Sequence, residues 1–157
     1  MYCLKYTQLL PITVDECWSF FSDPKNLKVL TPEHMGFKIE NEPTAEMYPG
    51  QIIRYSICAL WNLSFEWVTE ITHVQKPDYF IDEQRVGPYS FWHHEHRFVA
   101  VPEGVEVIDI VYYRLPLGPL GKLLHEIKIK DELERIFAYR RAKLIEIFGD
   151  FEELHYS

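Results

Sequence analysis

Residues 91–115 read FWHHEHRFVAVPEGVEVIDIVYYRL, two alternating runs joined by the turn Pro102-Glu103-Gly104. Alternation with a period of two predicts β-strands, and a short connection that contains glycine predicts that the two strands pair as a hairpin. One parity carries charged residues and is expected to face solvent as a ladder of cross-strand ion pairs. The other parity mixes apolar side chains with a few polar ones. We therefore expect this second parity to face the interior of the protein.

Runs of this kind recur through the middle of the chain. The dipeptides Trp61-Asn62, Pro77-Asp78 and Gly87-Pro88 separate neighbouring runs, and turn residues at this spacing predict an antiparallel meander. A sheet of six or seven strands follows. The expected strands are Tyr2–Leu10, Gln51–Leu60, Leu63–Val74, Tyr79–Arg85, Phe91–Val101 and Val105–Leu115.

Two short helices are expected between the first strand and the meander. Thr13-Val14-Asp15-Glu16 is a capping box, which predicts a short helix that runs to Phe21. Asp23-Pro24 predicts the start of a second short helix, with Asp as the N-cap and Pro at the first helical position.

The last third of the chain changes period. From Leu120 to Phe148 the apolar residues recur at helical spacing, and Gly149 follows as a stop signal. One long amphipathic helix is expected here, with the region near Lys130 as the place where it could break. This order of elements predicts an α+β fold and one domain over residues 1–157, in which a curved antiparallel sheet wraps around the C-terminal helix. Such an arrangement leaves a cavity between sheet and helix.

Strand parity also predicts which side chains line this cavity. On the inner parity, aromatic and aliphatic residues alternate with a few polar ones, and this mixture is typical of a small-molecule site. The expected ligand-binding residues of the sheet are Tyr55, Trp67, Phe80, Asp82, Gln84, Trp92, His94, His96, Asp109 and Tyr113.

Arg140 places a charge on the helix that covers the cavity. It lies four residues after Ile136 and four before Leu144, on the apolar stripe of the helix. An interior guanidinium needs an anion, because an unpaired buried charge is strongly destabilising. We therefore expect Arg140 to contact ligand and to pair with Asp82 or Asp109. The alternative is that Arg140 lies at the edge of the stripe and extends to water.

Two kinds of chemistry can be considered for the polar residues. His94 and His96 alternate onto one strand face, a spacing that some zinc sites use, and Asp82 or Asp109 could add a third ligand. Hydrogen-bonded histidines in the cavity wall are the favoured interpretation, so neither a metal nor a cofactor is predicted. For acid–base catalysis, the candidates are His94, His96 and Tyr113. A network that orients a ligand is again favoured over catalysis.

Composition narrows the range of partners. The chain has 16 Lys and Arg against 24 Asp and Glu, a net charge of −8, so we expect no nucleic-acid partner. No apolar run approaches the ~18 residues needed to cross a bilayer, so no integral membrane association is expected. Three cysteines at wide spacing, without a C-x-x-C pair, indicate reduced thiols and a cytoplasmic protein.

Four separated stretches resemble one family. They are WSFFSDPKNL at residues 18–27, FIDEQRVGPY at 80–89, WHHEHRF at 92–98 and DIVYYRLPLG at 109–118. In this order they resemble the ligand-binding SRPBCC family of the START-like, helix-grip superfamily, and the resemblance covers nearly the whole chain.

The resemblance implies a curved sheet that grips a C-terminal helix around a cavity for a hydrophobic small molecule, such as a lipid, a quinone or a polyketide-like ring. Many members of the group have no known reaction, so a non-catalytic binding protein is the first expectation. A polyketide cyclase or dehydratase is one alternative. A protein-interaction module is another.

Overall fold

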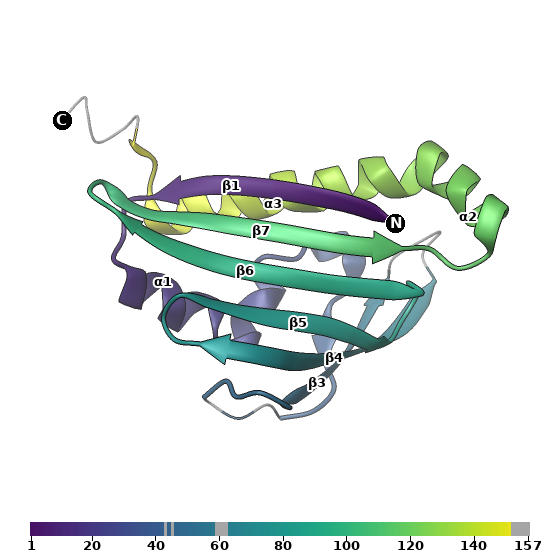
Figure 1. The fold of residues 1–157 in the computed structure, drawn as a ribbon, viewed down its shortest axis with the longest axis horizontal. Helices are drawn as coiled ribbons and strands as arrows, with labels where there is room; N and C mark the ends of the chain where they lie inside the picture. The colour runs from purple at the N-terminus through teal and green to yellow at the C-terminus, as the bar shows by residue number, and fades with distance from the viewer. Residues whose placement is uncertain (43, 45, 59–62, 152–157) are drawn as a thin grey trace.

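A seven-stranded antiparallel sheet forms the body of the protein. The computed structural model describes residues 1–42, 44, 46–58 and 63–151. Within them the strand order is β1-β7-β6-β5-β4-β3-β2, so every strand from β2 to β7 pairs with its neighbour in sequence and β1 closes against β7 (Figure 1). The strands are β1 (Tyr2–Leu10), β2 (Lys38–Ile39), β3 (Ile52–Cys58), β4 (Ser64–Gln75), β5 (Tyr79–Val86), β6 (Phe91–Val101) and β7 (Gly104–Arg114).

The strands agree with the expected meander to within a few residues. The two-residue strand β2 was not expected, and the expected turn at Trp61-Asn62 lies outside the described residues. At the β6–β7 turn, Gly104 has φ of 156°, and a Cβ atom there would collide with the carbonyl oxygen of Leu10. The turn therefore requires glycine both for its backbone conformation and for the close approach of β1.

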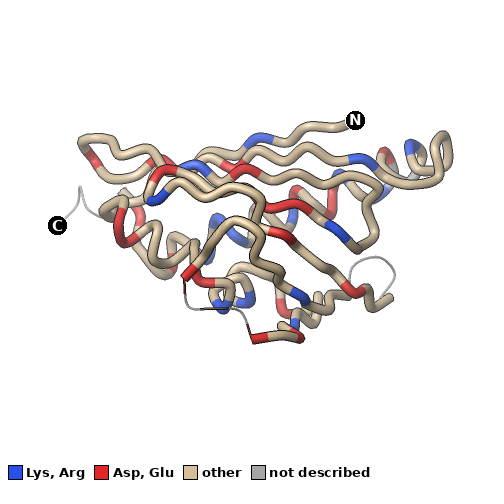
Figure 2. Tube along the Cα trace, turned by 60° about the horizontal axis from the view of Figure 1, so that its bottom comes forward, with Lys and Arg blue, Asp and Glu red and all other residues tan. Residues whose placement is uncertain are grey.

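The solvent face of the sheet carries ion pairs, of which Arg85–Glu70 joins two strands as expected, whereas Arg85–Glu83 and Arg97–Glu95 each lie within one strand. Arg85 reaches Glu70 at 2.6 Å and Glu83 at 2.9 Å, and Arg97 reaches Glu95 at 2.6 Å. In Figure 2 the basic residues lie scattered among the acidic ones over the part of the chain that is described. The parity argument that assigned charged residues to the outer face is confirmed for these side chains.

Short helices close one end of the sheet. Helix α1 (Val14–Phe21) begins at the expected capping box: the Glu16 N–H donates to Thr13 Oγ1 at 3.2 Å, and the Thr13 N–H donates to the Glu16 carboxylate at 2.8 Å. The second short helix is the 3₁₀ helix η1 (Pro24–Lys28), capped by Asp23. A third, η2 (Glu33–Met35), was not expected, because a single 3₁₀ turn has no periodic pattern to reveal it.

The C-terminal helical segment is less regular than predicted. It consists of α2 (Gly118–Leu124), the π-helical stretch η4 (His125–Ile129) and α3 (Lys130–Phe148). The break therefore lies just before Lys130. The His125 ring stacks on Tyr2 at 3.5 Å between centroids and lies 2.8 Å from the Tyr113 hydroxyl, and these tertiary contacts accompany the change of helical period.

Helix α3 runs beside β1 and covers the inner face of the sheet (Figure 1). Its buried side chains are Leu133, Phe137, Arg140 and Leu144. Together with the short helices, it makes the fold α+β and of the helix-grip type, as predicted. No helix in the described part of the chain combines the length and the hydropathy that crossing a bilayer requires.

Candidate functional site

A largely apolar cavity of about 210 Å³ lies between the inner face of the sheet, the short helices and α3. Strands β3 to β6 supply one wall, residues from α1 to Phe37 supply another, and the C-terminal segment supplies a third. The expected ligand-binding residues that line it are Tyr55, Trp67, Phe80, Asp82, Trp92, His94, His96 and Arg140.

Gln84 lies outside the lining. Its side-chain amide donates to the Tyr89 carbonyl at 2.6 Å, and its carbonyl oxygen accepts from the Tyr89 N–H at 3.2 Å. Gln84 therefore holds the β5–β6 turn, and the ring of Tyr89, which sequence reasoning did not select, takes a place in the cavity wall. Gln84 thus shapes the cavity by holding Tyr89 in place, although Gln84 itself does not line the cavity.

Tyr113 also lies away from the lining, which corrects its expected role at the site. The side chain is fully buried, its hydroxyl lies 2.8 Å from His125 Nε2, and it belongs to a second apolar cluster with Val111, Ile129 and Leu133. Burial raises the pKa of Tyr113 to about 12. Parity correctly placed Tyr113 on the inner face, but at this end of the sheet the C-terminal segment fills the space that parity left open.

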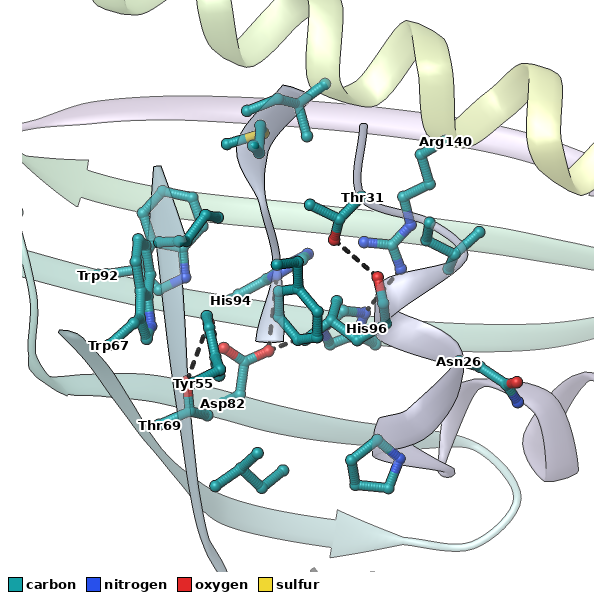
Figure 3. A pocket seen from close by; sticks show the side chains of 18 of the residues that line it. Asn26, Thr31, Tyr55, Trp67, Thr69, Asp82, Trp92, His94, His96 and Arg140 are labelled. Atoms are coloured by element: carbon teal, nitrogen blue, oxygen red, sulfur yellow. Dashed lines mark hydrogen bonds and ion pairs between the residues drawn. The ribbon is translucent and has the colours of Figure 1, made fainter. Parts of the chain in front are cut away.

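Five ionisable residues meet at the centre of the inner face, and we call Asp82, His94, His96, Asp109 and Arg140 the polar cluster. The strand register produces it: Asp82 on β5 pairs with His94 on β6, and His96 on β6 pairs with Asp109 on β7. Residues of one parity on three neighbouring strands therefore converge on one patch. Figure 3 shows Asp82, His94 and His96 side by side in the cavity, with Arg140 reaching in from α3.

Asp109 lies behind the two histidines rather than in the cavity wall. Its Oδ1 atom is 3.0 Å from His94 Nε2 and 3.0 Å from His96 Nδ1. The same oxygen is 3.5 Å from Arg140 Nη2, and Arg140 is only 8% exposed. The expected pairing of Arg140 with an interior carboxylate is confirmed, and the alternative in which Arg140 extends to water is wrong.

Asp82 contacts the opposite sides of the same two rings. Its Oδ2 atom lies 2.8 Å from His96 Nε2, a hydrogen bond, and 3.6 Å from His94 Nδ1, which is beyond hydrogen-bond distance. Each histidine thus has one ring nitrogen toward Asp109 and the other toward Asp82 and the cavity. Together the ligand atoms of Asp82, His94 and His96 lie within 4.8 Å of one another.

Burial and charge shift the pKa values of the polar cluster in different directions. Burial lowers the pKa of His94, and the neighbouring His96 lowers it further. Burial also acts to lower the pKa of His96, but hydrogen bonds with Asp109 and Asp82 outweigh it and raise that pKa. Although burial opposes ionisation of Asp109, the charge of Arg140 and the two histidines hold its pKa well below the usual range. Burial opposes ionisation of Asp82 as well, but its hydrogen bond with His96 and the charges of the two histidines and Arg140 outweigh burial and lower that pKa.

Two buried donors in the cavity wall have no hydrogen-bond partner among the residues that the structure describes. They are the indole Nε1 of Trp67, a side chain that is 7% exposed, and Nε of Arg140. Buried polar atoms are rarely left unpaired, because the lost hydrogen bond costs about 1–3 kcal/mol. Each atom therefore marks a place where an acceptor from outside the chain would be stabilised.

Sequence reasoning did not identify which residues of the short helices and of the segment after them line the cavity. Leu27, Leu30, Met35 and Phe37 line it, as does Thr31, whose hydroxyl donates to the Leu27 carbonyl at 2.7 Å. The only available signal was that apolar residues continue through a segment without clear strand or helix periodicity. Such residues must be buried, but the sequence does not say against what.

Comparison with known proteins supports the fold. No family model matches the chain, and no curated protein does. A crystal structure from Chromobacterium violaceum is similar with a TM-score of 0.73 at 10% identity, covering 96% of this chain and 99% of that one. A solution structure from Arthrobacter aurescens has a TM-score of 0.69 at 13% identity, over 92% and 86% of the two chains. Ara h 8.0201 has a TM-score of 0.59 at 13% identity, over 92% and 98%. At these identities the similarity shows the fold alone.

Proposed function

We propose that residues 1–157 form one START-like domain of the SRPBCC type, which binds a small hydrophobic molecule in the cavity and holds its polar group against the polar cluster. The observation that carries this proposal is an apolar cavity of about 210 Å³ whose wall contains ionisable residues on one side and two unpaired buried donors. Apolar burial contributes roughly 25 cal/mol per Å², and the few polar groups fix orientation.

The volume favours a compact ligand. An apolar cavity of ~150 Å³ is large enough to hold benzene. At about 210 Å³, this cavity has room for one or two rings with short substituents. Among the expected ligand classes, a quinone or a polyketide-like ring therefore fits better than a lipid with a long acyl chain.

The unpaired donors indicate that the ligand carries hydrogen-bond acceptors. In Figure 3, Trp67 and Arg140 lie on opposite sides of Asp82 and His94. A planar molecule with a carbonyl oxygen at each end could satisfy the Trp67 indole N–H and the Arg140 guanidinium together. Its ring would then pack against aromatic residues of the cavity lining, which include Tyr55, Phe80 and Trp92.

Replacing Trp67 with phenylalanine tests this arrangement, because the change removes the N–H but keeps an aromatic ring. A panel of benzoquinones, naphthoquinones and matched naphthalenes without oxygen should be measured by isothermal titration calorimetry. We expect Trp67→Phe to weaken carbonyl ligands about tenfold, the size of one hydrogen bond, and to change the naphthalenes little.

The result that would overturn the proposed function is the absence of binding by the whole panel to the wild-type protein, together with no organic compound released on denaturation of protein purified from its host.

An acid–base enzyme of the cyclase or dehydratase type is the second candidate. The observation that favours it is His94 Nδ1, a ring nitrogen at the cavity wall that lies 3.6 Å from Asp82 and makes no hydrogen bond with it. Such a nitrogen could accept a proton from a bound substrate, and Arg140 could stabilise an enolate oxygen. Turnover of a bound ligand that is lost in His94→Gln, with ligand affinity retained, would support this candidate.

A further inference from the structure

Three side-chain atoms of the polar cluster converge at one point of the cavity wall. Asp82 Oδ2 lies 2.8 Å from His96 Nε2 and 3.6 Å from His94 Nδ1, and the three residues offer their ligand atoms within 4.8 Å of one another. Metal–ligand bonds of 2.0–2.2 Å at tetrahedral angles would place neighbouring ligand atoms about 3.4 Å apart. Two of the separations lie on either side of that value and the third is at most 4.8 Å, so side-chain rotation would be enough to bring the three atoms around one ion.

Asp109 orients both histidines for this purpose. A single carboxylate oxygen, Oδ1, lies 3.0 Å from His94 Nε2 and 3.0 Å from His96 Nδ1. If both nitrogens donate their protons to this oxygen, the lone pairs of His94 Nδ1 and His96 Nε2 point toward Asp82. Metal-binding histidines characteristically donate their second ring N–H to a carboxylate in this way.

Charge also favours a cation at this point. The polar cluster contains the carboxylates of Asp82 and Asp109 and one guanidinium, that of Arg140, all at most 16% exposed. With both histidines neutral, these groups carry a net charge of −1 in the protein interior. Without an ion, a proton shared by His96 Nε2 and Asp82 Oδ2, which lie 2.8 Å apart, would bring this net charge to zero, and a bound cation would take the place of that proton.

From this geometry we propose that Asp82, His94 and His96 bind a divalent transition-metal ion, with Asp109 as the acceptor that positions both histidines. Two imidazoles and one carboxylate are a ligand set used for Zn²⁺ and for Fe²⁺ in sites with open coordination positions. The three residues belong to the cavity wall, so the open positions face the cavity and could bind an oxygen atom of a ligand. The site does not depend on the proposed hydrophobic ligand, because all three ligand residues belong to the protein.

The experiment uses the full chain, stripped with chelator and dialysed, and titrated with Zn²⁺ alone in calorimetry and with Co²⁺ alone in visible absorption. We expect one ion per chain and a Co²⁺ spectrum of low coordination number. Histidine ¹⁵N spectra should show the largest changes at Nδ1 of His94 and Nε2 of His96.

Substitutions separate the ligands from the positioning residue. Asp82→Asn and His96→Gln should abolish stoichiometric binding. Asp109→Asn keeps all three ligands and should weaken Zn²⁺ binding about 10–100-fold. The matched control is His93→Gln, because His93 lies on the opposite face of the same strand, where it contacts Glu83 at 2.8 Å, and this change should leave the affinity unaltered. Circular dichroism of each variant distinguishes loss of a ligand from loss of the fold.

Two results would overturn the metal site. One is wild-type protein that binds neither ion with 1:1 stoichiometry. The other is binding that is lost in His93→Gln and kept in folded Asp82→Asn, which would assign the ion to the outer surface. Repeating the quinone panel in the presence of chelator keeps this outcome separate from failure of the proposed ligand binding.

Discussion

At the scale of single residues, strand parity was enough to bring Asp82, His94, His96 and Asp109 to one face, and helical spacing was enough to bury Arg140. Parity gives the face of the sheet on which a side chain lies, but it does not tell whether that side chain reaches the cavity or lies beneath its neighbours. Asp109 lies behind the histidines, and the Gln84 side chain holds the β5–β6 turn. Both positions depend on how side chains of neighbouring strands contact one another, which parity does not describe. The ring nitrogen that each histidine turns toward the cavity could not be inferred from sequence for the same reason.

Arg140 offers a direct test of the polar cluster. Arg140→Met should lower the free energy of unfolding by about 3–5 kcal/mol, because it leaves the buried Asp109 carboxylate without its cation. Chemical denaturation at neutral pH measures the change. Arg141→Met is the matched control, since Arg141 is exposed on the same helix, and it should change stability by less than about 0.5 kcal/mol. Equal effects of the two substitutions would show that the ion pair contributes nothing.

At the scale of elements, periodic or capped segments were predictable and short or tertiary-determined ones were not. The long strands and α1 follow from alternation and from the capping box. Strand β2 has two residues and η2 has three, which is too short for any period to appear. The π-helical stretch η4 depends on contacts of His125 with Tyr2 and Tyr113, which are distant in sequence.

The capping box of α1 has a predictable pH dependence. Thr13→Ala should cost about 1 kcal/mol at pH 7, the usual effect of removing an N-cap side chain. Hydrogen bonds from the Thr13 backbone and side chain hold the pKa of Glu16 below its ordinary value. Stabilisation by a carboxylate with a lowered pKa is present above its unfolded-state pKa and is lost as the pH falls through its folded-state pKa.

The stability difference between wild type and Thr13→Ala should therefore shrink between pH 7 and pH 3.5. Urea unfolding at several pH values measures it, with Ser19→Ala in the same helix as control. A difference that stays constant over this range would contradict the role of Glu16 in the cap.

At the scale of the whole molecule, the sequence predicted that a cavity exists but not its size. The volume depends on how rings from β3 to β6 interlock with side chains from the short helices and α3, and no pattern in one segment encodes that fit. The two elements that enclose the cavity, the sheet and α3, were predictable, because the sequence shows only one helix long enough to cover the sheet. The space left between them was measurable only in three dimensions.

Filling the cavity should separate ligand binding from stability. Ile53 lines the cavity and is 5% exposed, whereas Ile52, next to it on β3, is 41% exposed and points to the other face. Ile53→Phe should abolish binding of the quinone panel while changing the free energy of unfolding by less than about 2 kcal/mol. Ile52→Phe should leave both properties nearly unchanged. Retained affinity in a folded Ile53→Phe variant would place the ligand elsewhere.

The contact between Arg140 and Asp109 also bears on how a molecule enters and leaves the cavity. Lifting α3 away from the sheet would carry the guanidinium out of reach of the buried Asp109 carboxylate, and separating a buried ion pair in this way is strongly unfavourable. Displacing η1 and η2 breaks no buried ion pair within the described residues, since His34 of η2, which lies 3.6 Å from Glu132 of α3, is largely exposed and the lining side chains there are mainly apolar. We therefore expect a ligand to enter and leave the cavity past the short helices, which move aside, while α3 stays in place against the sheet.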